Sequence, residues 1–185
     1  MDLFESIRMN LAGEVRRNLA AGADPNARDA EGVPAVVRAL DATVHWGDAG
    51  TVGLLRAAGA DAAPLIEAVD RRLRTLPATL LQRHNHTTAA INALVADFGN
   101  AYRALAPDDR ETLAEYLREA ERFDLESRDL RAAAARLGEA FAHGDRTHAD
   151  DPGLDEAVTL LARIGRFEIH GLGLAARTVS LRQMR

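Results

Sequence analysis

The chain has 185 residues, of which 47% are hydrophobic and 28% charged, a balance typical of one globular domain or two small ones. The sequence has no cysteine and no apolar run long enough to span a membrane, which excludes disulfides, thiolate metal sites and membrane helices. The formal net charge of -5 disfavours broad nucleic-acid binding, and no secretory signal is recognisable, so we expect a soluble, cytoplasmic protein.

A segment near the N-terminus occurs twice. Residues 13–24 (GEVRRNLAAGAD) and residues 50–61 (GTVGLLRAAGAD), 37 positions apart, are identical at seven of twelve positions. Each copy predicts a short amphipathic helix that ends at a glycine, Gly22 or Gly59, because glycine readily takes the left-handed conformation of a helix C-terminus. Turn-forming residues follow Gly22, and Pro34 suits the start of another helix. The pattern predicts helix, stop, projecting turn and helix.

This run resembles the ankyrin repeat, which combines a β-turn with two helices about every 33 residues. Residues 22–27 (GADPNA) resemble the end of a repeat, and residues 29–35 (DAEGVPA) resemble the opening of the next, although valine and alanine replace the usual threonine and leucine. The resemblance covers roughly residues 3–69. It implies a partner protein held by the projecting turn and the first helix of each repeat. The candidate partner-binding residues are Asp29, Glu31, Arg38, His45 and Trp46.

The repeats depart from the family pattern in number and spacing. The spacing of 37 adds about four residues near positions 41–50, and only two alanines separate Asp61 from Pro64, so a further projecting turn is almost absent. Because a repeat array needs about three units to bury its apolar faces, we expect the rest of the chain to cap it. The predicted organisation is ankyrin-like repeats over 1–76 and a helical bundle over 77–185, packed into one continuous body.

Apolar residues three or four positions apart predict helices through the second half of the chain. We expect a long helix over 78–105, a second that begins at Pro107, a third over 126–142 and a fourth from Leu154 to Ile164. Residues 166–185 fit either a short strand or a helix, and the helix is favoured because every earlier segment is helical. The predicted fold class is therefore all-α, a short ankyrin-like stack of helical hairpins capped by a helical bundle.

The histidines raise the possibility of a metal site, but their spacing does not support one. His84 and His86 lie two positions apart and so point to different faces of a helix. Glu139 and His143 share a face but lack the second set that a helical di-iron site needs. The polar loop 143–151, with three aspartates and two histidines, lacks the EF-hand spacing and is interpreted as a solvated turn. No metal or cofactor is predicted.

Motifs for other chemistry are missing. The chain has no glycine-rich phosphate loop and no nucleophile elbow, which disfavours an enzyme without excluding one. The dense basic run Arg71, Arg72 and Arg74 lies close to Glu67 and Asp70, so helix-surface ion pairs are favoured over contacts to phosphate.

The favoured function is a non-enzymatic protein–protein interaction module, either an adaptor or an immunity-type protein that neutralises a toxin. The alternatives are a helical ligand-binding or metal-binding domain or enzyme that uses the repeats as a scaffold, and a self-assembling structural subunit. A bacterial source is expected from the abundance of alanine and the use of arginine for every basic side chain. Trp46, the single tryptophan, suits an exposed interface anchor, but the favoured interpretation is that it covers the junction between repeats.

Overall fold

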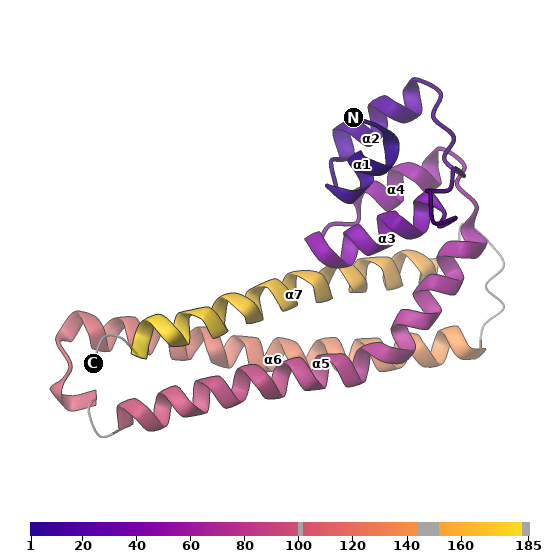
Figure 1. Ribbon diagram of the computed structural model, residues 1–185. Helices are drawn as coiled ribbons and strands as arrows, with labels where there is room; N and C mark the ends of the chain where they lie inside the picture. Colours follow the sequence, from indigo (N-terminus) through magenta and orange to yellow (C-terminus); the bar gives the residue numbers. More distant parts are fainter. Residues whose placement is uncertain (100–101, 144–151, 183–185) are drawn as a thin grey trace. The chain divides into compact units, whose positions relative to one another are not determined.

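The computed structural model describes residues 1–99, 102–143 and 152–182 (Figure 1). Within these ranges all regular structure is helical, which confirms the predicted all-α class, and the one strand-like pairing in them is an isolated bridge between Arg28 and Pro34. The chain forms two compact units, each built from two segments. The first unit comprises Met1–Thr75 and Ala133–Arg166, and the second comprises Leu76–Ala132 and Phe167–Arg185. No helix in the described ranges is both long and apolar enough to cross a membrane.

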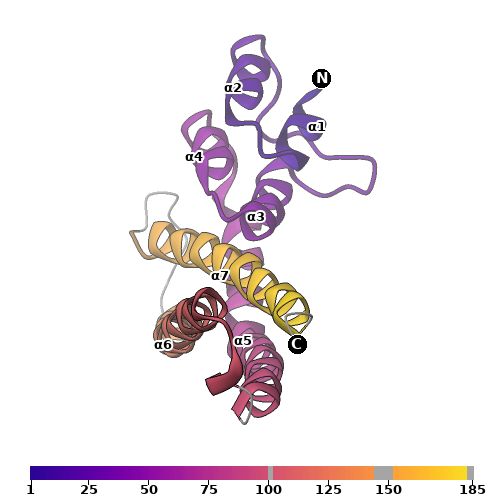
Figure 2. The ribbon, with the colours of Figure 1, turned by 90° about the vertical axis from the view of Figure 1, so that its left-hand side faces the viewer.

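Four short helices open the first unit: α1 (Leu3–Arg8), α2 (Ala12–Ala20), α3 (Ala35–Trp46) and α4 (Gly50–Ala57). They form two hairpins, α1–α2 and α3–α4. The hairpins stack so that α1 packs on α3 and α2 packs on α4 (Figure 2). Local signals set their ends. The Asp2 side chain caps α1 by accepting the backbone N–H of Glu5 at 2.7 Å, and Gly47 ends α3 in the left-handed conformation with φ 72°.

The sequence repeat is also a repeat of backbone geometry. Gly22 and Gly59 both have φ 93°, and each follows a helix whose last carbonyls are satisfied in the same way. The N–H of Ala23 donates to the carbonyl of Asn18, and 37 positions later the N–H of Ala60 donates to the carbonyl of Leu55, both at 3.0 Å. The two copies therefore end their helices with one local solution, a glycine in the left-handed conformation.

A single side chain ties the two repeat ends together. The Asn26 amide nitrogen donates to the carbonyl of Gly59 at 3.2 Å, and its amide oxygen accepts the N–H of Asp61 at 2.7 Å. Helix α5 (Ala62–Gly99) begins directly afterwards. As expected from the two-alanine spacing, a second projecting turn does not form here.

The remainder of the first unit comes from late in the chain, from α6 (Pro107–His143) and α7 (Pro152–Arg182). Gly165 on α7 lies against α3 so closely that a Cβ at this position would overlap the carbonyl oxygen of Val44. The neighbouring Arg166 donates from its guanidinium to the carbonyl of Gly47, at the end of α3. These contacts attach the second segment of the unit to its short helices.

The second unit is made of the remaining parts of α5, α6 and α7, which pack around aromatic side chains. Phe123 of α6 stacks on Phe167 of α7 with ring centroids 4.2 Å apart and planes 7° from parallel. Tyr116 is fully buried two turns earlier on α6, and burial raises its pKa to about 12. Gly171 lies beneath the Phe123 ring, where a side chain would collide with it.

The predicted helix boundaries were wrong at four places. The long helix was expected to run to residue 105, but α5 ends at Gly99 and a short 3₁₀ helix, η1 (Tyr102–Ala104), follows. Helix α5 begins at Ala62 and passes through position 77, where the sequence suggested a start. The two helices expected on either side of residue 125 are one helix, α6. The fourth helix and the tail are also one helix, α7, which confirms the helical interpretation of the tail through Arg182. A short gap in the apolar stripe, or a proline, weakens the periodic signal in the sequence. It does not end the helix where the segments before and after it are both held by packing.

Candidate functional site: a groove on the first unit

A groove of about 740 Å³ lies on the first unit between α1, the projecting turn and α3. All five residues predicted from the sequence line this groove: Asp29, Glu31, Arg38, His45 and Trp46. The structure thus places in one depression residues that span 18 positions of the chain, from the turn to the end of α3.

Helical spacing explains why α3 presents one side to the groove. Arg38, Asp41, Ala42 and His45 are three or four positions apart, so they share a helix face. The opposite face of α3 carries Val36, Ala39 and Leu40, which are buried in the core. Burial of that apolar face fixes the rotation of α3 and therefore aims its polar face at the groove.

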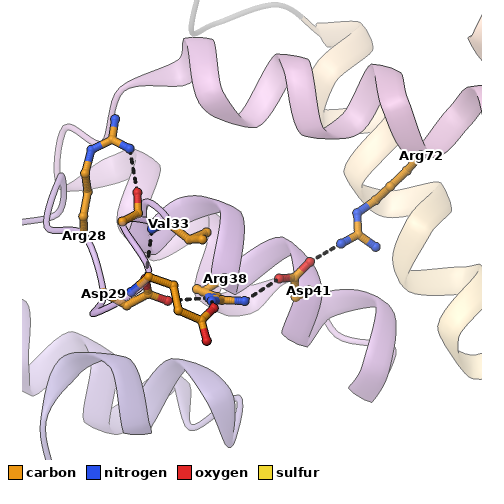
Figure 3. Close-up of polar contacts among 8 residues, drawn as sticks. Arg28, Asp29, Val33, Arg38, Asp41 and Arg72 are labelled. Carbon is orange, nitrogen blue, oxygen red and sulfur yellow. Dashed lines mark hydrogen bonds and ion pairs between the residues drawn. The ribbon is translucent and has the colours of Figure 1, made fainter.

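The projecting turn is held by the carboxylate of Asp29. Its Oδ1 accepts the N–H of Glu31 and the N–H of Val33, both at 2.9 Å, and its Oδ2 accepts Nε of Arg38 at 2.6 Å (Figure 3). The backbone closes the same turn, because the N–H of Asp29 donates to the carbonyl of Val33 at 3.0 Å. The hydrogen bond from Val33 lowers the pKa of Asp29; burial opposes this shift, and Arg38 and the N–H of Glu31 add to it.

Arg38 links the turn to α3 through several carboxylates. Besides Asp29, its guanidinium pairs with Glu31 and lies 3.7 Å from the carboxylate of Asp41. Asp41 in turn pairs with Arg72 of α5, so the ion pairs form a chain along one wall (Figure 3). The hydrogen bonds that Arg38 donates to the carboxylates of Asp29 and then Glu31 raise its pKa, so the guanidinium stays charged. This guanidinium already contacts three carboxylates of its own chain.

The other end of the groove is apolar and aromatic. Trp46 is 45% exposed and Met9 is 44% exposed. The indole N–H of Trp46 donates to the carbonyl of Arg8 at 3.0 Å, and the His45 ring meets the indole edge-on at a centroid distance of 4.7 Å. The interpretation favoured from the sequence is that Trp46 covers the junction between repeats. It does contact the end of α1, but nearly half of its surface remains exposed, because it is the last residue of α3.

The contribution of α1 to the groove was not predicted from the sequence. Phe4, Glu5, Arg8 and Met9 line the groove from this helix, beside the buried Leu3 and Ile7. Phe4 and Glu5 lie three to five positions before Arg8 and Met9, a spacing that places all four on one side of a short helix. No motif marked that side, because the family resemblance is carried by the repeat ends and not by α1.

The dense basic run has a structural role. Arg71 pairs with Glu67 at 2.8 Å and Arg74 pairs with Asp70 at 2.9 Å, which confirms the expected ion pairs on the helix surface for these two arginines. Arg72 instead pairs with Asp41 of α3.

The histidine clusters give no metal site in the part of the chain that the structure describes. His84 is half-buried, and its Nε2 lies 3.2 Å from the carboxylate of Asp124, whereas His86 is exposed. Across residues 1–99, 102–143 and 152–182, no three His, Cys, Asp or Glu side chains group as metal ligands would. The polar loop considered for a divalent ion has residues 144–151 and the His143 side chain outside the described part.

Comparisons of this chain with protein-family models, with curated proteins and with solved structures found no match.

Proposed function

We propose that this protein is a non-enzymatic interaction module of the bacterial cytoplasm, in which ankyrin-like repeats receive a segment of a partner protein. It would act as an adaptor or as an immunity-type protein that masks a toxin. One observation carries the proposal. A groove of about 740 Å³ collects the projecting turn, one face of α3 and an exposed tryptophan, which are the positions that the repeat resemblance implies.

The local geometry supports the repeat assignment. Two helical hairpins stack on each other, both copies end at a glycine with φ 93°, and a turn closed by Asp29 projects between them. Interface hot spots are enriched in tryptophan and arginine that sit in a pocket and are held in place before binding. Trp46 meets this description, because the hydrogen bond to Arg8 fixes its ring while nearly half of its surface stays open.

The test compares capture by the full-length protein and by variants. Trp46→Ala and His45→Ala change the apolar end of the groove, and Leu172→Ala changes an exposed apolar side chain of the second unit. We expect a specific partner from lysates of the source cells to bind the wild type and Leu172→Ala equally. Trp46→Ala should weaken the binding of that partner by about 30-fold or more, the effect of losing about 2 kcal/mol at a hot spot.

Each variant is first checked for an unchanged circular dichroism spectrum and thermal transition. His45→Ala guards against a folding defect in Trp46→Ala, because His45 is exposed and its removal leaves the indole hydrogen bond in place. The proposal is wrong if the captured proteins are the same for the wild type and for both groove variants.

A further inference from the structure

We infer that the groove selects a cationic segment that carries a bulky apolar residue, such as an arginine-rich or lysine-rich stretch of a partner protein. This inference rests on the proposed function and specifies the chemistry of the partner. The inference comes from three features of the lining, namely its net charge, the ion pairs that its arginines already make and the position of its aromatic end.

The lining is acidic. Five carboxylates face the groove against two guanidiniums, which leaves an excess of three negative charges. Arg72 reaches Asp41 from outside the lining and offsets one of the three. A concave surface with an excess of one sign of charge attracts segments of the opposite sign and repels those of the same sign.

The arginines of the lining offer little to an acidic partner. Arg38 already pairs with Asp29 and Glu31, so a partner carboxylate would have to displace one of them. Arg8 is exposed and makes no ion pair among the described residues, so of the two arginines in the lining it alone has a guanidinium open to an acidic group. The carboxylate of Glu5 is also exposed and makes no ion pair within the same described ranges, so it is available to a guanidinium or an ammonium group.

The aromatic end supplies the second element of recognition. The exposed part of Trp46 lines the same end of the groove as Met9, and together they give a platform on which an aliphatic side chain or the stem of an arginine can pack. A cation that stacks on the indole gains a further cation–π contribution. A segment with an apolar residue on Trp46 and a basic residue near the carboxylates therefore matches both ends of the groove.

The experiment selects short peptides from a random display library on the immobilised full-length protein. Selected peptides without tryptophan are then titrated against the protein in solution, with the emission of Trp46 as the signal, since it is the only tryptophan in the chain. We expect the selected peptides to be enriched in arginine or lysine beside a large apolar residue and depleted of aspartate and glutamate.

Two variants of the same helix should shift affinity in opposite directions. Glu5→Gln removes a free carboxylate and should weaken binding about two- to fivefold, the range for a solvent-exposed ion pair. Arg8→Ala removes a like charge and should strengthen binding by a similar factor. Both differences should shrink as salt is added, because screening acts on exposed charges.

The outcomes separate the inference from the function on which it rests. Selected peptides that are neutral or acidic, and whose binding Trp46→Ala abolishes, would overturn the cationic partner but leave the groove as an interaction site. Selected peptides that bind Trp46→Ala and Glu5→Gln as well as the wild type would overturn both, and so would the absence of any selected peptide.

Discussion

Glu119 makes two charge-assisted contacts within the second unit. Its Oε1 lies 2.9 Å from Nε2 of His170, and its Oε2 pairs with the guanidinium of Arg177, both on α7. The guanidinium carbon of Arg177 lies 5.4 Å from the ring centroid of the buried Tyr116, so this carboxylate also orients a cation over an aromatic ring. The contact to His170 lowers the pKa of Glu119 below its ordinary 4.5; burial opposes the shift and Arg177 adds to it.

The lowered pKa of Glu119 predicts an acid-sensitive contribution to stability. A carboxyl whose pKa is depressed in the folded protein stabilises it above the ordinary value of 4.5, and the contribution disappears as the pH falls through the folded pKa. The free energy of unfolding should therefore fall more steeply below pH 4.5 in the wild type than in Glu119→Gln. Denaturant titrations at a series of pH values measure both slopes.

Glu121→Gln is the matched control for this comparison. Glu121 lies two positions away on α6, is exposed and makes no ion pair within the described residues. Its variant should keep the acid slope of the wild type. Superimposable pH profiles for the wild type and Glu119→Gln would refute the assigned role of the carboxylate.

Residue chemistry in the groove was only partly predictable from the sequence. The turn residues Asp29 and Glu31 could be found, because a repeat motif places a turn directly after a glycine stop. The ion-pair chain from Arg38 to Arg72 could not, because it joins residues 34 positions apart in a geometry that no local pattern encodes. The exposure of Trp46 was the less favoured of two interpretations, since it depends on where α3 ends.

At the scale of helices, two glycines of α7 differ in whether their surroundings leave room for a side chain. Gly165 lies where a Cβ would overlap the carbonyl oxygen of Val44, so its lack of a side chain lets α7 approach α3 within the first unit. Gly173 belongs to the same helix in the second unit, is exposed, and has nothing near the place where a Cβ would stand. Only the first glycine is required by packing.

Alanine at these two positions should therefore change stability with opposite signs. Gly165→Ala forces two packed backbones apart and should destabilise the protein by about 1–3 kcal/mol or more, the range for overpacking. Gly173→Ala should stabilise it by about 0.5–1 kcal/mol, because alanine restricts the unfolded chain and favours helix. Thermal melts and denaturant midpoints of the two single variants provide the measurement. Equal effects of the two substitutions would contradict the close approach of α7 and α3.

Helices could be located from the sequence much better than their ends. Apolar spacing identified the helical segments in the second half of the chain, because burial of one face imposes a period of 3.6. The boundaries at positions 77 and 125 were wrong because they depended on local signals, a proline and a short gap in the stripe. Inside long helices those signals compete with packing on both sides, and packing decides the outcome.

At the scale of the molecule, the two units are interleaved along the chain. The first unit joins residues 1–75 to residues 133–166, and each long helix begins in one unit and ends in the other. Sequence analysis placed a single boundary near residue 76. The second segment could not be predicted, because periodicity indicates that a helix face is buried but not which distant segment buries it. The expectation of one continuous body stays a prediction.

The interleaving predicts that residues 1–76 alone do not unfold cooperatively. Without residues 133–166 the fragment lacks the α7 residues Leu154, Leu161 and Ile164, which are fully buried in the complete chain. An open apolar end of a short repeat array favours disorder or association. Calorimetry and urea titration of the fragment should give a broad transition.

A single-chain control tests the same idea. Residues 1–75 joined through a short Gly/Ser linker to residues 133–166 contain both segments of the first unit, and this linked chain should recover a sharp transition. The approach of Gly138 to the carbonyl of Leu73, where a Cβ would lie at 3.8 Å, shows that the joined ends are close enough for such a linker. A sharp transition in the fragment 1–76 itself would show that the late segment is dispensable.

The separation of the two segments has a consequence for the timing of synthesis. The groove residues leave the ribosome early, but Arg166, which holds the carbonyl of Gly47, is 119 positions further along the chain. At a synthesis rate of roughly 5–20 residues per second, Arg166 is added on the order of 10 s after Gly47. During this interval the end of α3 lacks the contact from Arg166, so any protein that meets the nascent chain encounters α3 without a support that the finished protein has.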